Sequence, residues 1–352
     1  MKGWKTYKLS EVAEIKYGKD HKLLSDGDIP VFGSGGIMRY ADKAIYDKES
    51  ILIPRKGTLS NLFYLDKPFW SVDTMFYTKI SEGTSGKFLY YLLKNLNLAS
   101  MNVGSAVPSL TTEVLNKVEI NLPDLKSQKQ IASILSSLDN KIELNLQMNN
   151  TLEAMAQAIF KEWFVNFNFP GSKGKLIDSL PKGWRMGKLS EVLEIKYGKD
   201  YKHLTNGNIP LYGSGGIMKY VDAAIYDRES ILIPRKGTLS NLFYTNKPFW
   251  SVDTMFYTKI KAEAAGKYLF YLLKTLDLES MNVGSAVPSL TTEVLNNLLI
   301  QIPSIEILKQ FEVLVTSMHE KLESNIIENQ VLSDIRDSIL PKLMTGKIEV
   351  KE

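Results

Sequence analysis

The most regular pattern of apolar positions in the chain lies between residues 131 and 163. Apolar and amide side chains recur there in alternating steps of four and three, which is the a/d seam of a heptad repeat. The seam residues are Ile131, Leu135, Leu138, Ile142, Asn145, Asn149, Leu152, Ala156, Ile159 and Trp163. The pattern predicts a long helix that opens at a Ser-x-x-Gln capping box, residues 127–130, and stops near Asn166.

The same seam recurs 180 positions later, from Phe311 to Leu343, and departs from the first at Arg336 and Pro341. We expect Pro341 to end this second helix before Leu343, because proline has no N–H to donate within a helix. A long helix with one apolar stripe is stable in water only if the stripe is covered. We therefore expect the two helices to pair as an antiparallel coiled coil. The alternative is two separate helices.

Two asparagines occupy the middle of each seam. Antiparallel pairing would bring Asn145 and Asn149 close to Asn329 and Asn325. Buried asparagines in a coiled-coil seam reduce stability and fix the register of the helices. On separate helices, the same four side chains would face solvent.

Short β-type runs alternate with Gly- and Pro-containing turns before each long helix. Strands are predicted at residues 51–54, 61–64 and 75–80, with turns at 33–36, 54–57 and 66–68. Helices are predicted at residues 87–98 and 112–116. This mixture predicts an α+β fold for the globular part.

The sequence of the globular part occurs twice in the chain. Residues 4–115 align without a gap with residues 184–295, and about three quarters of the aligned residues are identical. Such a long repeat is a domain duplication, because solenoid repeats have periods of about 20–50 residues. The predicted organisation is a globular domain (1–125), a spacer helix (126–169), a linker (170–181), a second globular domain (182–305), and a second spacer helix with a tail (306–352).

Composition narrows the class of protein only slightly. The chain has no cysteine, which excludes disulfides and thiolate metal sites and fits a reducing cytoplasm. Its first residues lack an apolar signal core, and no run approaches the length of a membrane span. A net charge of +4 is compatible with nucleic acid but does not argue for it alone.

Motifs for catalysis are missing from the sequence. His21 aligns with Tyr201 and His203 with Leu23, so neither domain preserves a histidine of the other. There is no P-loop, no methyltransferase Asn/Asp-Pro-Pro-Tyr/Phe motif and no nuclease motif. For Asp73 and Asp253 we expect a buried structural hydrogen-bonding role. We predict neither catalytic residues nor a metal site.

Three polar loops suit recognition of DNA, and their sequences are preserved in both domains. Residues 81–85, in contrast, differ between the two copies. The three loops centre on Arg-Lys-Gly, Tyr-Gly-Lys-Asp and Asn-Val-Gly-Ser, joined by a Gly-Ser-Gly-Gly turn. Arg and Lys pair with phosphates or guanine, Asn pairs with adenine, and Tyr can stack on bases. The alternative is that all are surface turns. The candidate DNA-binding residues are Tyr17, Lys19, Ser34, Arg55, Lys56, Ser60, Asn61, Asn102 and Ser105, with Tyr197, Lys199, Ser214, Arg235, Lys236, Ser240, Asn241, Asn282 and Ser285 in the second domain.

This layout resembles the specificity subunit of type I restriction–modification systems. The resemblance covers essentially the whole chain and rests on residues 123–145 as the opening of a spacer helix, 180–185 as the entry to a recognition domain, and 340–350 as the ending. It implies two target-recognition domains that read a split DNA site and helices that dock two methyltransferase subunits. It also implies a possible restriction/translocase partner. S-adenosylmethionine, ATP and Mg would belong to the partner subunits, with no cofactor in this chain.

Two features depart from the family. The chain is short, and its two domains are far more alike than usual, so we expect a nearly palindromic site. Two other classes of function stay open from the sequence. One is a protein-binding scaffold with duplicated domains on a coiled-coil spacer, which the modest charge favours. The other is a self-contained enzyme, which the missing motifs disfavour.

Overall fold

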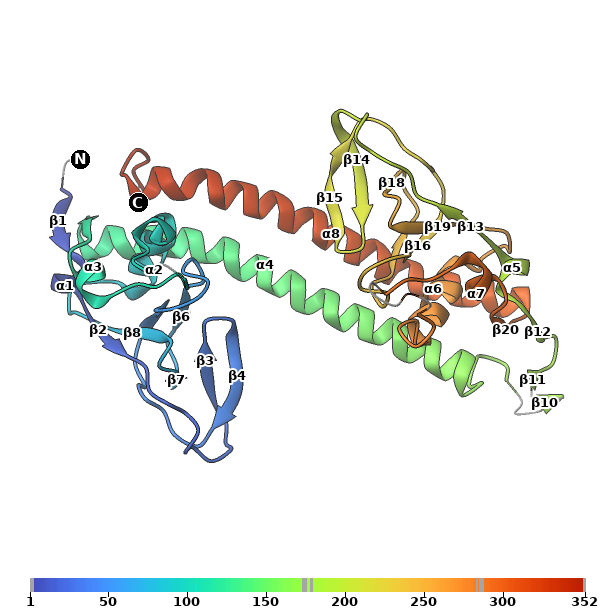
Figure 1. The fold of residues 1–352 in the computed structure, drawn as a ribbon, viewed down its shortest axis with the longest axis horizontal. Helices are drawn as coiled ribbons and strands as arrows, with labels where there is room; N and C mark the ends of the chain where they lie inside the picture. Colours follow the sequence, from blue (N-terminus) through green and yellow to red (C-terminus); the bar gives the residue numbers. More distant parts are fainter. Residues whose placement is uncertain are drawn as a thin grey trace. The chain divides into compact units, whose positions relative to one another are not determined.

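The computed structural model of the chain describes residues 3–104, 106–172, 176–177, 180–282, 284 and 288–350, with backbone alone at 176–177. The chain divides into two compact units. The first contains Met1–Leu146 with Ile326–Glu352, and the second contains Gln147–Asn325. Each unit therefore holds one globular domain together with a segment of each long helix (Figure 1). None of the described helices has the length and apolarity that crossing a membrane requires.

The first domain is α+β. Its elements are β1 (Lys5–Lys8), α1 (Leu9–Val12), β2 (Ala13–Tyr17), β3 (Ile29–Gly33), β4 (Gly36–Ala41), β5 (Ser50–Pro54), β6 (Phe63–Leu65), β7 (Trp70–Ser71), β8 (Met75–Ile80), α2 (Gly86–Asn95), the 3-10 helix η1 (Leu98–Met101), α3 (Thr112–Asn116) and β9 (Glu119–Leu122). An antiparallel sheet has the order β2-β8-β5-β6, and a smaller sheet has the order β4-β3-β7. Strands β1 and β9 pair separately.

The second domain repeats this architecture. Its elements are β10 (Leu176–Ile177), β11 (Leu180–Pro181), β12 (Arg185–Lys188), α5 (Leu189–Val192), β13 (Leu193–Tyr197), β14 (Asn206–Gly213), β15 (Gly216–Val221), β16 (Ser230–Pro234), β17 (Phe243–Thr245), β18 (Trp250–Ser251), β19 (Met255–Ile260), α6 (Gly266–Thr275), α7 (Thr292–Asn296) and β20 (Leu299–Ile302). The sheets β13-β19-β16-β17 and β15-β14-β18 match those of the first domain. The predicted α+β duplication is confirmed.

The core of each domain is completed by the end of a long helix. These helices are α4 (Leu125–Phe160), continued by a π-helical turn η2 (Lys161–Val165), and α8 (Ile305–Met344). In the first unit, Leu340 and Leu343 near the end of α8 are buried among residues of α2 such as Phe88. In the second unit, Phe160 and Phe164 of α4 and η2 are buried with Tyr268. The helix that leaves one domain thus contributes its far end to the core of the other.

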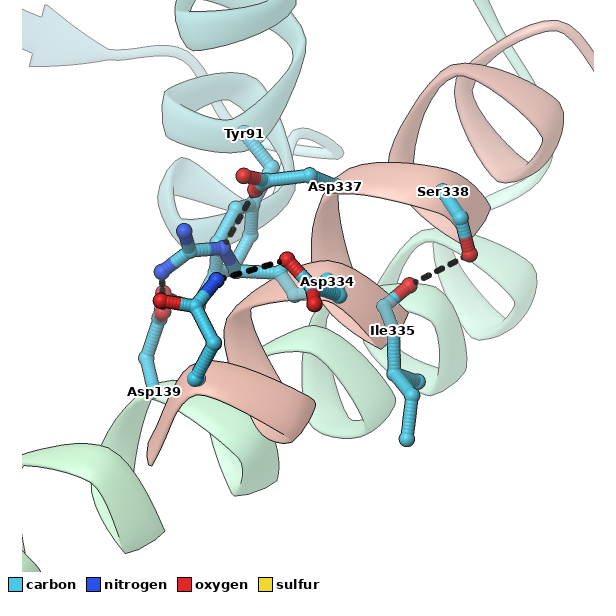
Figure 2. A network of polar contacts seen from close by, with 8 residues as sticks. Tyr91, Asp139, Asp334, Ile335, Asp337 and Ser338 are labelled. Carbon is cyan, nitrogen blue, oxygen red and sulfur yellow. Dashed lines mark hydrogen bonds and ion pairs between the residues drawn. The ribbon is translucent and has the colours of Figure 1, made fainter. Parts of the chain in front are cut away.

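The two helices pair antiparallel in each unit. In the first unit, Asn145 Nδ2 donates to Asn329 Oδ1 at 2.9 Å, while Asp139, earlier in α4, accepts from Arg336, later in α8, at 2.7 Å. Figure 2 shows Asp139 and Tyr91 of α2, whose hydroxyl donates to the other oxygen of Asp139 at 2.7 Å. The predicted antiparallel seam is confirmed.

The central asparagines lie where the heptad phase places them. In the second unit, Asn325 Nδ2 donates to Asn149 Oδ1 at 2.8 Å. Asn145 and Asn325 are completely buried. Amide pairs across the seam form only at one alignment of the helices, so they fix its register.

Both long helices differ from prediction at one end. Asp124, not Ser127, caps α4, because Asp124 Oδ1 accepts from the Ser127 backbone N–H at 3.0 Å. Ser127 is the third residue of the helix, so the prediction that residues 127–130 open it as a capping box is wrong. Pro341 lies inside α8, which continues to Met344. Burial of Leu340, Leu343 and Met344 in the domain core holds this last turn helical despite the proline.

Candidate nucleic-acid interface

The polar loops singled out from the sequence meet at one edge of the first domain. Tyr17 is the last residue of β2, and Arg55 follows directly after β5. These strands both pair with β8, so their ends lie close together. We call residues 17–22, 33–36, 55–61, 102–104 and 106–109 the loop cluster.

Arg55 connects the first two loops of the cluster. Its guanidinium lies over the ring of Tyr17, with 5.4 Å between Cζ and the ring centroid. Its Nη1 also donates to the backbone oxygen of Asp73 at 3.1 Å. Tyr17 is 51% exposed and Arg55 is half-buried. The pair offers a flat, cationic surface of the kind that stacks on bases or binds phosphate.

Backbone hydrogen bonds attach the loop at 102–109 to the Arg-Lys-Gly loop. The Gly57 N–H donates to Pro108 O at 3.0 Å, and the Leu110 N–H donates to Arg55 O at 2.9 Å. Lys56 forms an isolated bridge with Ser109. Its side chain is exposed, as is that of Lys19. These fixed loops hold two cations at the surface at low entropic cost, which favours binding of an anion.

The candidate amides differ in how much bonding capacity remains. Asn61 Nδ2 donates to Ser34 O at 2.7 Å, which fixes the Gly-Ser-Gly-Gly turn next to the Arg-Lys-Gly loop. Asn102 Oδ1 accepts from the N–H groups of Gly104 and Ser109, both at 2.8 Å, and its Nδ2 donates to Gly104 O at 3.0 Å. Asn102 therefore spends most of its donors and acceptors on shaping its own loop.

The second domain builds the same cluster. Arg235 lies 5.4 Å from the centroid of Tyr197 and donates to Asp253 O at 3.0 Å. Asn241 donates to Ser214 O at 2.7 Å, and Asn282 closes its loop as Asn102 does. The side chains of Lys199 and Lys236 are exposed.

One candidate hydroxyl has different surroundings in the two domains. Ser240 donates to Glu279 at 3.0 Å, whereas the position of Glu279 is Ala99 in the first domain and Ser60 is exposed there. Two further candidates, Ser105 and Ser285, lie outside the residues that the structure describes.

A cavity of about 500 Å³ opens beside the loop cluster of the first domain. Its wall includes Asp20, His21 and Lys22 from one loop, Ser34 from the turn, and Asp73. The expected burial of Asp73 is wrong. Its side chain is exposed, because β7 ends at Ser71 and the chain turns outward before β8, and its backbone oxygen rather than its carboxylate makes the structural contact with Arg55.

Sequence reasoning missed an exposed apolar strand next to this cavity. Met38 and Tyr40 of β4 are 59% and 51% exposed, and Met38 also lines the cavity. Met218 and Tyr220 of β15 are 54% and 48% exposed. The sequence holds a signal for this exposed strand. Both copies keep its apolar residues, although an alternating strand buries only one of its two faces.

The one carboxylate of the loop cluster is held by its own loop. The pKa of Asp20 is lowered, chiefly because its carboxylate accepts from the Lys22 backbone N–H. Among the described residues, no group of three or more His, Asp or Glu side chains is placed to hold a metal ion. In the loop cluster the cations Lys19, Lys22, Arg55 and Lys56 outnumber the one carboxylate, Asp20, so the cluster can bind a polyanion.

Comparison with known proteins shows the family to which the chain is similar. A family model described as the type I restriction modification DNA specificity domain matches residues 1–154 and 181–329. The chain is 26% identical to the type I restriction enzyme MjaIX specificity subunit of Methanocaldococcus jannaschii, over 100% of this chain and 95% of that protein. It is 25% identical to the HindI specificity subunit of Haemophilus influenzae, over 96% and 85% of the two chains. The crystal structure of a type I S subunit from M. genitalium shares the fold, with a TM-score of 0.72, 21% identity and coverage of 97% and 96%.

Proposed function

Because the chain belongs to the type I restriction–modification DNA specificity family, we propose that its two loop clusters read a split DNA site, one half-site each. The chain is a non-catalytic subunit whose role in the complex is DNA sequence recognition. One observation supports the assignment of DNA reading to these loops. The Arg–Tyr pair, with its flanking lysines and amide, has the same arrangement in both domains.

The chemistry of each cluster suits a division of labour on duplex DNA. Exposed lysines such as Lys19 and Lys56 suit phosphates, which supply affinity without sequence information. Arg55 presents a fork that can bond two acceptors of guanine, and Asn61 retains its amide oxygen beyond the bond to Ser34. Since the candidate residues are the same in both domains, the two half-sites should be nearly the same sequence in inverted orientation.

The partners we propose are double-stranded DNA and two methyltransferase subunits, with restriction/translocase subunits in a larger assembly. One support is an apolar stripe on α8 that does not face α4. Ile327, Val331 and Ile335 follow each other at intervals of four and are 54%, 51% and 43% exposed. Such a stripe is typical of a helix that packs against another protein. S-adenosylmethionine, ATP and Mg would be bound by those partner subunits.

The test is to map methylated motifs in a host genome with and without this chain. We expect a split motif of two nearly palindromic half-sites with an unread spacer, which disappears when the chain is absent. Binding of the methyltransferase complex to a duplex with this motif should weaken steeply with salt, because phosphate contacts release counterions. A motif that persists without the chain, or half-sites that are unrelated or directly repeated, would contradict the proposal.

A further inference from the structure

The lining of the cavity beside the first loop cluster differs from the corresponding residues of the second domain at a single position. Ten residues line the cavity, and nine of those positions carry the same residue in the second domain. The exception is His21, which corresponds to Tyr201. The nine shared residues offer the same chemical groups in both domains, so any difference in what the two sites accept must come from this position or from what surrounds it.

The cavity is continuous with the loops that we assign to DNA. Ser34 belongs to its wall and accepts from Asn61 through its backbone oxygen, at 2.7 Å. Asp73 belongs to the wall and accepts from Arg55 through its backbone oxygen, at 3.1 Å. A duplex bound by Arg55 and Asn61 would therefore place base edges next to the cavity.

His21 has bonding capacity that the fold does not use. Its Nδ1 is buried without a hydrogen-bond partner among the described residues. The backbone holds the residue in place, since the His21 oxygen accepts from the Leu24 N–H at 3.1 Å. Because Nδ1 is buried, only the other ring nitrogen, Nε2, of this half-buried imidazole can be offered to an acceptor or donor on a base edge.

Tyr201 has a different environment. Lys219 Nζ lies 5.2 Å from the centroid of its ring, and the ring packs against the second small core with Leu211. The residue that corresponds to Lys219 is Arg39, which is held by Asp26 at 2.7 Å instead. The tyrosine thus presents a phenol with a cation on its ring, where the first domain presents an imidazole without one.

We infer that His21 and Tyr201 are the specificity-determining residues that make the two half-sites differ. Each contacts the edge of one base pair beside the bases read by the shared loop cluster. The half-sites then agree at the positions read by the conserved residues and differ at the base pair next to this cavity. This inference rests on the proposed function, because it requires the loop cluster to face DNA.

The experiment is to map methylated motifs for the full chain, in complex with its methyltransferase subunits, as wild type and as His21→Tyr. The wild-type motif should break its palindrome at one base pair, and His21→Tyr should make that base pair match the other half-site. The cost of a mismatched base pair is commonly about 5- to 150-fold in affinity, so the change should be plain in the motif. The matched control is Leu23→His, which also copies the second domain but alters a completely exposed side chain, and it should leave the motif unchanged.

The reciprocal variant Tyr201→His should convert the other half-site, so the inference can be tested even if one variant fails to fold. Wild-type half-sites that are identical would overturn it. An asymmetry that survives both substitutions in complexes that still methylate DNA would also overturn it, and would point instead to the contact between Glu279 and Ser240. If the wild-type chain directs no methylation motif at all, the proposed function fails and the comparison of His21 with Tyr201 does not arise.

Discussion

At the scale of single residues, Arg55 and Arg235 carry the strongest expectation for DNA contact. Replacing both by alanine should lower affinity for the cognate duplex, because a base-reading arginine is worth about 1–3 kcal/mol, or about 5- to 150-fold, at each half-site. The measurement is fluorescence anisotropy with the methyltransferase complex and duplexes that vary one base pair at a time.

The double Arg→Lys variant is the matched control for charge. Lysine would restore contact to a phosphate but not paired bonds to guanine, so only affinity should recover if the arginine reads a base. Unchanged affinity and unchanged sequence preference in the alanine variant would mean that Arg55 serves only to hold Tyr17 and the carbonyl of Asp73.

His319 of α8 makes the second domain sensitive to acid. Its Nε2 shares a hydrogen bond of 2.9 Å with the Tyr271 hydroxyl. Burial, with a smaller effect from Lys267, lowers the pKa of His319 to about 4, from 6.5 in an exposed histidine. The unfolded chain therefore binds a proton more readily, and the stability contributed by neutral His319 is complete above pH 6.5 and is lost as the pH falls toward 4.

We expect the free energy of unfolding of the second unit to fall by about 1 kcal/mol between pH 7.5 and pH 5.5 through this group. Urea unfolding at the two pH values, read from hydrogen exchange of α6 and α8, measures it. His319→Gln should remove this component of the pH dependence, whereas His203→Gln should retain it because His203 is exposed. An equal pH dependence in both variants would contradict the assignment.

Much of the candidate site could be predicted from residue types, since loops with Arg, Lys, Asn and Tyr were preserved between the copies. The hydrogen bonds that individual side-chain atoms make could not be predicted. The sequence does not reveal that Asn102 is occupied by its own loop or that His21 faces Ser34 and Asp73, because these contacts join segments that are distant in the chain. Whether the candidate residues touch DNA stays a prediction.

At the scale of elements, the contact of Asp139 with Arg336 joins the two helices within the first unit. Arg336→Ala should leave Asp139 with only its bond from Tyr91, in a site where the two side chains are 25% and 18% exposed. We expect the first unit to lose about 1–3 kcal/mol, between the values for exposed and buried ion pairs. The measurement is faster hydrogen exchange along α8 after Ile326.

The control for this prediction is Asp337→Ala. Asp337 accepts from Arg336 Nε at 2.8 Å but is 64% exposed, so its loss should cost at most about 0.5 kcal/mol. A double-mutant cycle between Asp139 and Arg336 isolates the contact itself. Equal effects of Arg336→Ala and Asp337→Ala would show that the pair with Asp139 adds nothing.

The elements themselves were predictable to the extent that their signals are local. The heptad seam, the strand at 75–80 and the helix at 112–116 depend on neighbouring residues, and the structure has all of them. The ends of the long helices depend on distant packing. The last turn of α8 contains Pro341 because Leu343 and Met344 are buried against the first domain, which the helix sequence alone does not indicate.

At the scale of the whole molecule, we propose that the length of the paired helices sets the gap between half-sites. Deleting residues 145–151 together with 325–331 removes one heptad from each helix and keeps the seam in phase. At 1.5 Å per residue this shortens each helix by about 10 Å, which corresponds to about three base pairs at 3.4 Å each.

Motif mapping of this variant measures the unread spacer directly. The deletion removes all four central asparagines, so a variant that deletes residues 152–158 with 318–324 and keeps them serves as a second test. A spacer of unchanged length, in variants that fold and still direct methylation, would show that the helices do not set the distance.

The burial of Leu340, Leu343 and Met344 in the core of the first domain has a consequence for the order of events during synthesis. A ribosome makes the sheets of that domain first and the residues that cover its helix α2 last. Until α8 emerges, the apolar surface around Phe88 and Leu135 has no permanent cover. The first domain to be made is thus the last to be finished, and until then its uncovered apolar surface is a site at which nascent chains can aggregate.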